Sequence, residues 1–294
     1  MSRKWFSGIS AAILVLMVTA SAVAGHGDSR PPKQAILLAA FGTTVPEAQK
    51  AFEQVEASVK KAFPGVELRW AYTSSIVRAK LAQQGKVVQS PESALAKLMD
   101  DGYTHVAILS LHTIPGEEFH MLNQNARLFA QMTGGFEKVL LARPLLASHQ
   151  DMELAAKVVL RNIPADRKPE DAIVLMGHGT EKHPSDAIYL AMYHTLQELD
   201  QNCYIATVDG YPSLEDVLPK LREKKIKKVY VVPFMAVAGD HARNDMAGDK
   251  PGSWTSVLKK NGFVCEAVLK GTAEYPEMVD IWIDHLRPMM EHMK

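Results

Sequence analysis

The stretch Val106-Ala-Ile-Leu-Ser-Leu-His-Thr-Ile-Pro-Gly-Glu-Glu118 has a counterpart later in the chain, Val229-Tyr-Val-Val-Pro-Phe-Met-Ala-Val-Ala-Gly-Asp-His241. Both are apolar runs that end in glycine, an acidic residue and then a residue able to bind a metal. In register, Glu118 therefore matches His241. Repetition of this kind indicates that the chain consists of two similar halves.

A second pair of segments supports this duplication. Leu37-Leu-Ala-Ala-Phe-Gly-Thr-Thr44 resembles Val174-Leu-Met-Gly-His-Gly-Thr-Glu181, and each apolar run leads into a Gly-Thr pair. His178 of the second segment stands where the first segment has Phe41. Each half therefore contains two strand-like runs that end in residues suited to a site.

Short apolar runs alternate with segments of helical spacing along both halves. The predicted strands are residues 35–41, 66–72, 106–111, 139–142, 172–176, 204–208, 229–233 and 264–269. Strands that alternate with helices, and that are apolar on both faces, favour parallel sheets covered by helices. We predict an α/β fold with two similar lobes, residues 35–146 and 147–294, and an active site in the cleft between them.

Glu118, His178 and His241 all fall just beyond predicted strands, where open α/β sheets bind their ligands. Imidazole and carboxylate are ordinary ligands of divalent first-row metals, so we predict that these three residues bind a metal and carry the catalysis. Each has a structural alternative: a histidine that ends a strand, a histidine that caps a helix, and an acid that stabilises a helix N-terminus. Their matched positions in the two halves favour a shared site.

Three further histidines lie near these positions. His112 ends a strand and either faces the cleft or orients a neighbour through a hydrogen bond. His183, five residues after His178, is expected beside the metal ligands and not among them. His120 lies two residues past Glu118, so on a helix it points about 200° away. It is either a solvated histidine or a ligand of something other than the catalytic metal.

The composition excludes several functional classes. Basic and acidic residues both number 33, without a long basic block, so nothing indicates a nucleic-acid partner. The chain has no dinucleotide-binding glycine motif, P-loop or nucleophile elbow, which leaves nucleotide-dependent and acyl-transfer chemistry without motif support. The two cysteines, Cys203 and Cys265, either pair or remain two separate buried thiols.

The N-terminus has the organisation of a secretory signal. Ser2-Arg3-Lys4 precedes an apolar run over residues 9–18, and Ala22-Val23-Ala24 forms a small-residue cleavage site. We predict a cleaved signal peptide (1–24), a mature N-terminal tail (25–34) and a periplasmic location, the alternative being an uncleaved anchor. After the signal, no stretch has the roughly 20 apolar residues of a membrane-spanning helix.

Several segments together resemble the anaerobic (class II) sirohydrochlorin cobalt chelatases, relatives of the ferrochelatases. They are Leu37-Leu-Ala-Ala-Phe-Gly-Thr, Ala71-Tyr-Thr-Ser74, Ser110-Leu-His-Thr-Ile-Pro-Gly-Glu-Glu-Phe, Met176-Gly-His-Gly-Thr and Val232-Pro-Phe-Met-Ala-Val-Ala-Gly-Asp-His241. The resemblance implies two α/β lobes with the tetrapyrrole sirohydrochlorin between them. It also implies that His178 and His241 bind the metal with Glu118 nearby, and that Co²⁺, or alternatively Fe²⁺, is inserted into the ring.

The export signal departs from the biosynthetic members, which are usually cytoplasmic. The resemblance to an exported branch implies a bound haem, with His120 as its axial ligand, and a homo-oligomer. It leaves open an alternative function, an exported metal or haem binding and transport protein without turnover. Because sirohydrochlorin is a polycarboxylate, cationic side chains are expected at the mouth of the cleft. The candidates are Arg78, Lys80, Lys182 and Arg243.

Overall fold

A computed structural model describes residues 30–180 and 182–293. The predicted signal peptide, and the predicted tail up to residue 29, lie outside the described residues. The contacts of the chain divide it into Met1–Arg30 and Pro31–Lys294, and the fold belongs to the second unit. Within the described part of the chain, no helix is both long enough and apolar enough to cross a membrane.

The first half forms a parallel sheet of four strands in the order β2-β1-β3-β4. Its strands are β1 (Gln34–Ala40), β2 (Glu67–Tyr72), β3 (His105–Ser110) and β4 (Lys138–Leu141). The second half forms another parallel sheet in the order β6-β5-β7-β8. Its strands are β5 (Ala172–Gly177), β6 (Cys203–Thr207), β7 (Lys228–Pro233) and β8 (Val264–Ala267).

The two sheets share one strand order, which confirms the internal duplication. β1 and β5 occupy the same place, and each is followed by a glycine with positive φ: Gly42 at 97° and Gly179 at 80°. A Cβ on Gly42 would lie 2.4 Å from the ring of Tyr72, and one on Gly179 would lie 2.6 Å from Cβ of Thr207. The glycine of the Gly-Thr pair that the two halves share is therefore required by the turn that follows the strand.

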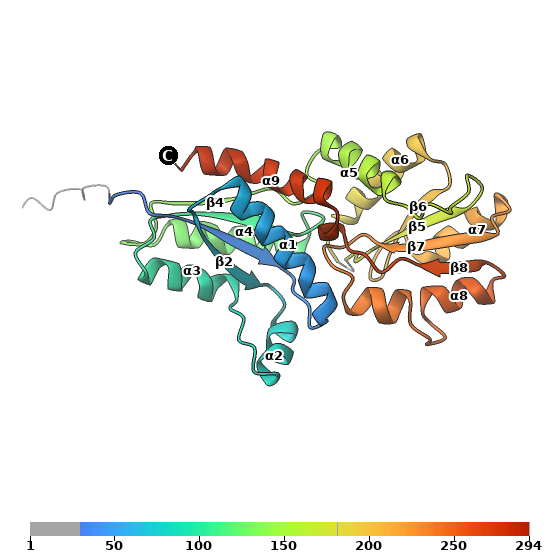
Figure 1. Ribbon diagram of the computed structural model, residues 1–294, viewed down its shortest axis with the longest axis horizontal. Coiled ribbons are helices and arrows are strands. Elements are labelled where there is room, and N and C mark those ends of the chain that lie inside the picture. Colours follow the sequence, from blue (N-terminus) through green and yellow to red (C-terminus); the bar gives the residue numbers. More distant parts are fainter. Residues whose placement is uncertain (1–29, 181, 294) are drawn as a thin grey trace, which may run out of the picture. The chain divides into compact units, whose positions relative to one another are not determined.

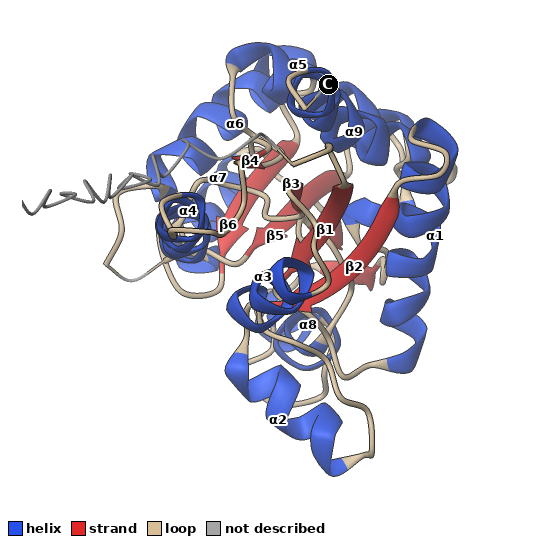
Figure 2. Ribbon diagram, turned by 90° about the vertical axis from the view of Figure 1, so that its left-hand side faces the viewer, coloured by secondary structure: helices blue, strands red, loops and turns tan. Residues whose placement is uncertain are grey.

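Helices cover both faces of each sheet (Figures 1 and 2). They are α1 (Pro46–Ala62), α2 (Ser75–Gln83), α3 (Pro91–Asp100), α4 (Glu117–Ala130), α5 (His149–Arg161), α6 (Asp186–Leu199), α7 (Leu214–Glu223), the π-helix η1 (His241–Met246), α8 (Trp254–Lys260), the 3₁₀ helix η2 (Thr272–Glu274) and α9 (Pro276–Glu291). Strands in both halves are followed by helices, as the alternating apolar pattern predicted. The predicted two-lobed α/β fold is confirmed.

The largest hydrophobic core joins the two sheets. Alternate residues of β1 point to opposite faces, so Ile36 and Leu38 enter this core while Leu37 enters a separate one under α3 and α4. Leu175 of β5 belongs to the same core as Leu38. α1, α5, α6 and α9 supply its helical side, whereas α7 and α8 cover the other face of the second sheet. The shared core fixes how the two sheets face each other.

The closing helix α9 crosses from the second sheet to the first (Figure 1). It contacts β3 and β4, and its end is tied to the first sheet. Gln34 Nε2 donates to Met293 O at 2.8 Å, and Lys138 Nζ donates to His292 O at 2.7 Å. The lobe boundary at residues 146 and 147 stays a prediction, since α9, although assigned to the second lobe, lies against the first.

The two cysteines are far apart in the second sheet. Cys203 lies in β6 and Cys265 in β8, the two opposite edges of the four-stranded order, and both are free. Three strand spacings of about 4.8 Å separate these edges, whereas a disulfide needs Cα atoms within about 7 Å. Of the two alternatives left open by the sequence, the structure shows separate thiols.

His285 of α9 is buried, although its sequence suggests a surface histidine. It lies one helical turn from Trp282, on the apolar face of α9, and is 6% exposed. Its Nε2 contacts Asp151 Oδ1 at 3.0 Å and its Nδ1 contacts Arg143 O at 3.2 Å. Each ring nitrogen therefore faces an oxygen that accepts a hydrogen bond, one from a backbone carbonyl and one from a carboxylate.

Asp151 links this histidine to the start of α5. Burial would raise the pKa of the carboxyl, but hydrogen bonds with His285 and Ser148 outweigh it, so the pKa of Asp151 lies below its ordinary value. A carboxyl with a lowered folded pKa stabilises the fold above its unfolded pKa of about 3.9, and that stability is lost as pH falls through the folded value.

We therefore expect Asp151→Asn to lower Tm near neutral pH, because His285 loses its anionic partner. The difference from wild type should shrink as pH falls below about 4, where the wild-type carboxyl becomes protonated. Thermal unfolding measured between about pH 7 and about pH 3 tests this. Asp284→Asn, which removes an exposed carboxyl on α9, the helix of His285, is the matched control. A difference in Tm that stays constant over this range would contradict the ion pair.

Candidate functional site

A cavity of about 680 Å³ lies between the two lobes. Its walls come from the segments that follow β1, β2 and β3 in the first lobe and β5, β6 and β7 in the second. Because all strands of each sheet are parallel, their carboxyl ends meet at this one place. Glu118, His178 and His241 all line the cavity, together with apolar side chains such as Phe41 and Val237.

His178 follows the central strand β5. Its Nδ1 lies 3.1 Å from the carbonyl oxygen of Gly179, which can only accept, so Nδ1 carries the proton. The lone pair of the neutral ring is then on Nε2. The nearest acidic oxygen, Asp209 Oδ2, lies 4.0 Å from this Nε2, too far for a direct hydrogen bond. Nε2 of His178 is therefore available to a ligand.

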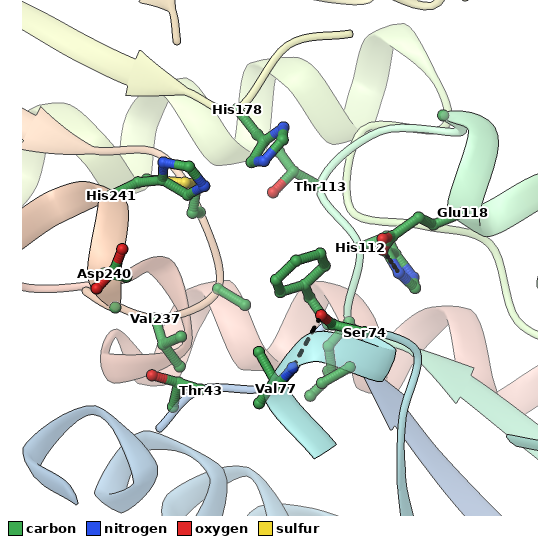
Figure 3. A pocket seen from close by; sticks show the side chains of 18 of the residues that line it. Thr43, Ser74, Val77, His112, Thr113, Glu118, His178, Val237, Asp240 and His241 are labelled. Carbon is green, nitrogen blue, oxygen red and sulfur yellow. Dashed lines mark hydrogen bonds and ion pairs between the residues drawn. The ribbon is translucent and has the colours of Figure 1, made fainter. Parts of the chain in front are cut away.

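His241 opens the π-helix η1 after β7. Its Nδ1 lies 2.7 Å from Asp245 Oδ2, one turn further along the chain. A carboxylate on Nδ1 fixes the ring and leaves Nε2 as the unprotonated nitrogen, the arrangement common for metal-binding histidines. The rings of His178 and His241 are 4.8 Å apart between centroids and nearly perpendicular, at 89°. Figure 3 shows the two side by side in the cavity.

Glu118 lies across the cavity from this histidine pair, next to His112 (Figure 3). It sits in the first turn of α4 and contacts Thr73 and His112 through Oε2. Within residues 30–180 and 182–293, no three His, Cys, Asp or Glu side chains are close enough together to hold a metal ion. The structure thus pairs the two histidines without Glu118, and metal binding by Glu118 stays a prediction.

The other histidines are placed as follows. His112 lines the cavity and also contacts Glu118, so both alternatives that the sequence left open apply to it. The ring of His183 lies 5.1 Å from the ring of His120, between centroids. His120 is exposed and extends from the first turn of α4. His183 therefore approaches His120, and its expected place beside the metal ligands stays a prediction.

Sequence reasoning missed two acids beside the histidine pair. Asp245 lies four residues after His241, a helical spacing that could have identified it. Asp209 lines the cavity and follows the strand β6, so its place at a strand end was also readable from the sequence. Its backbone N–H donates to the carbonyl oxygen of His178 at 2.9 Å, which ties the two loops together.

Two of the four cations expected at the mouth line the cavity, Lys80 and Lys182. The other two are held by backbone carbonyls. Arg78 donates to Tyr72 O and, at 2.7 Å, to Thr73 O, while Arg243 donates to Ala238 O at 3.2 Å.

A tyrosine hydroxyl in the wall is excluded as a base. Tyr189 lines the cavity below His178, and burial raises the pKa of its hydroxyl. A phenol of this kind stays protonated near neutral pH. The groups able to accept a proton or bind a metal in this part of the cavity are therefore the imidazoles and the carboxylates.

Solved structures similar to this fold include a sirohydrochlorin chelatase. SirB from Bacillus subtilis subspecies spizizenii, a sirohydrochlorin chelatase in complex with cobalt, is 14% identical with a TM-score of 0.56, over 88% of this chain and 96% of that one. CbiX, the terminal enzyme of sirohaem biosynthesis in denitrifying bacteria, is 16% identical with a TM-score of 0.55, over 86% of this chain and 98% of that one. At these identities the likeness shows the fold, which is that of the two-lobed chelatases.

The family model for cobalt chelatase (CbiK) matches residues 34–291, and the chain belongs to that family. The sirohydrochlorin cobaltochelatase CbiKC of Nitratidesulfovibrio vulgaris is 42% identical over 254 residues, covering 86% of this chain and 89% of that protein. The sirohydrochlorin cobaltochelatase of Salmonella typhimurium is 32% identical over 256 residues, covering 86% and 95%. The family that the motifs resembled is confirmed.

Proposed function

We propose that this protein is a sirohydrochlorin cobaltochelatase, which inserts Co²⁺ into the tetrapyrrole. One observation carries the proposal: His178 and His241 are both tied through Nδ1 and both leave Nε2 free in one interlobe cavity. The names of the two relatives, each similar over most of its length, support this substrate and this metal. Imidazole ligands suit Fe²⁺ as well, so Fe²⁺ is a second metal to test.

Insertion requires that two pyrrole N–H bonds break while the metal passes to the ring nitrogens. We assign His178 and His241 to hold the incoming Co²⁺ on the second-lobe side of the macrocycle. Once the metal leaves them, their Nε2 atoms can accept a proton. Glu118, on the opposite wall, is assigned to balance the charge or to take the second proton. The two pyrrole protons thus have acceptors from both lobes.

The remaining walls suit a flat, polyanionic macrocycle. Apolar side chains such as Phe41, Ile76 and Phe119 offer surface for the ring. Lys80 on α2 and Lys182 after β5 bring a cation from each lobe to the carboxylates at its periphery. The alternative, an exported metal or haem carrier, needs binding without turnover, and measuring turnover separates the two.

Anaerobic incubation of the purified protein with sirohydrochlorin and Co²⁺, followed by absorbance, should show conversion to the cobalt complex. His178→Ala and His241→Ala should each lower the rate strongly while Tm stays close to that of wild type, because both side chains lie at the cavity and not in a core. His194→Ala, an exposed histidine on α6, is the control. If wild type binds sirohydrochlorin and Co²⁺ but does not form the cobalt complex, the carrier is favoured. If His178→Ala and His241→Ala both react at the wild-type rate, the assigned site is refuted.

We further propose export, on the sequence of residues 1–24 alone. The mature chain is expected to begin near Gly25 and to be found in the periplasm. Intact-mass measurement of the protein from a periplasmic extract should show the loss of the first 24 residues. Recovery of the full-length chain from the membrane fraction would contradict this proposal and favour an uncleaved membrane anchor.

Haem binding by His120 is a separate proposal, and the surroundings of this residue fit the group. His120 is exposed, and Met121 and Leu128 on the same helix are 55% and 56% exposed. The latter two are seven residues apart and lie on one face of α4. If haem binds there, His120 would hold its iron and the exposed apolar side chains would contact the ring, and a second copy of the chain could contribute the same face because a symmetric interface brings like surfaces together. Bound haem would supply a redox-active iron there, outside the chelation cavity.

After haem-replete expression, wild type should show a Soret band and His120→Ala should lose most of it. If the haem joins two copies, the oligomer size of His120→Ala, measured by light scattering, should be smaller than that of wild type. His149→Ala, an exposed histidine on α5, controls for adventitious binding. Identical spectra for wild type and His120→Ala would remove the role of His120 and leave the chelatase proposal untouched.

A further inference from the structure

Glu118 is held through a single oxygen by two side chains from different strand ends. Thr73, which follows β2, donates from Oγ1 to Glu118 Oε2 at 3.0 Å. Nε2 of His112, which follows β3, lies 3.3 Å from the same Oε2. In the part of the chain that the structure describes, Oε1 of Glu118 has no hydrogen-bond partner. The carboxylate is therefore anchored on one side and open on the other.

The tautomer of His112 follows from its two partners. Ser110, in β3 and fully buried, places its Oγ 2.8 Å from Nδ1 of His112 and accepts the backbone N–H of His112 at 3.5 Å. A hydroxyl can donate or accept, whereas the carboxylate of Glu118 can only accept, so Nε2 carries the ring proton and donates it to Glu118. Nδ1 then accepts from the hydroxyl of Ser110. The chain of donors runs from Ser110 through His112 to the carboxylate.

Thr73 is fixed just as firmly by its backbone. Its N–H donates to Ala40 O at 2.8 Å, and its carbonyl accepts from Arg78 at 2.7 Å. These contacts hold the hydroxyl at the edge of the first sheet, where it meets the first turn of α4. This also explains why Arg78, expected at the substrate mouth, turns towards the backbone.

We infer that Thr73 and His112 are positioning residues that hold Glu118 by Oε2 and so leave Oε1 free to take part in the reaction. The inference rests on the proposed chelatase function. It gives Glu118 the arrangement seen in His178 and His241, where one atom is tied to the protein and one is left free. Groups fixed in this way react faster because less ordering remains for the transition state. Loss of such an orienting partner typically costs about 10–100-fold in activity or metal affinity.

Paired substitutions separate the hydrogen bonds from the bulk of the side chains. Thr73→Val and His112→Leu remove the donors, whereas Thr73→Ser and His112→Gln keep one within reach of Oε2. For the two donor-deleting variants we expect kcat to fall about 10-fold or more, with KM for sirohydrochlorin little changed. The two conservative variants should recover most of that loss. Co²⁺ affinity measured without tetrapyrrole should stay at the wild-type value, since the histidine pair is intact.

A double-mutant cycle with Glu118→Gln gives a second, independent readout. If Thr73 and His112 act only through Glu118, Thr73→Val should lower the single-turnover rate of Glu118→Gln little further. Melting curves identify any variant that does not fold. If His112→Leu does not fold, the Thr73 variants alone decide the outcome, because valine and threonine have nearly the same shape.

The inference is overturned if Thr73→Ser loses as much activity as Thr73→Val, or if the effects of Thr73→Val and Glu118→Gln simply add. A wild type that binds sirohydrochlorin and Co²⁺ but inserts no metal would instead overturn the proposed function. The two failures are thus distinguished by the wild-type rate.

Discussion

The structure depends on two parallel sheets that share one hydrophobic core. Parallel pairing sends every carboxyl strand end of a lobe in one direction, and the core that joins Leu38 of β1 to Leu175 of β5 sets the two lobes against each other. The segments that follow six strands then line one cavity. Neither lobe alone contains the site, because the histidine pair belongs to the second lobe and Glu118 to the first.

Inside the cavity, hydrogen bonds decide which atoms are free to react. Gly179 O holds His178, Asp245 holds His241, and Thr73 with His112 holds Glu118. Each partner occupies one polar atom of the functional side chain and leaves the other exposed to the cavity. A metal passed to a macrocycle needs ligands that bind and then release it, and two fixed imidazole nitrogens leave other coordination positions open. The geometry therefore suits transfer of a metal better than its permanent storage.

The internal duplication explains both the likeness and the difference of the two lobes. Gly42 and Gly179 keep the same left-handed turn after equivalent strands. The neighbouring position has diverged from Phe41 in one lobe to His178 in the other, and Glu118 has the place that His241 has in the second lobe. One repeated framework thus provides an apolar and acidic wall on one side and a wall with two histidines on the other.

The sequence by itself determined the class of fold and three residues of the cavity, Glu118, His178 and His241. Apolar periodicity and turn chemistry are local, so the strands, their ends and the matched segments were all readable. The tertiary structure alone decided that His178 pairs with His241 while Glu118 lies opposite, that Arg78 and Arg243 turn to backbone carbonyls, and that His285 is buried against Asp151. These outcomes depend on partners distant in the chain or on the direction of a single side chain. A hydrogen bond forms only where folding brings donor and acceptor to within about 3 Å, and no local pattern specifies that distance.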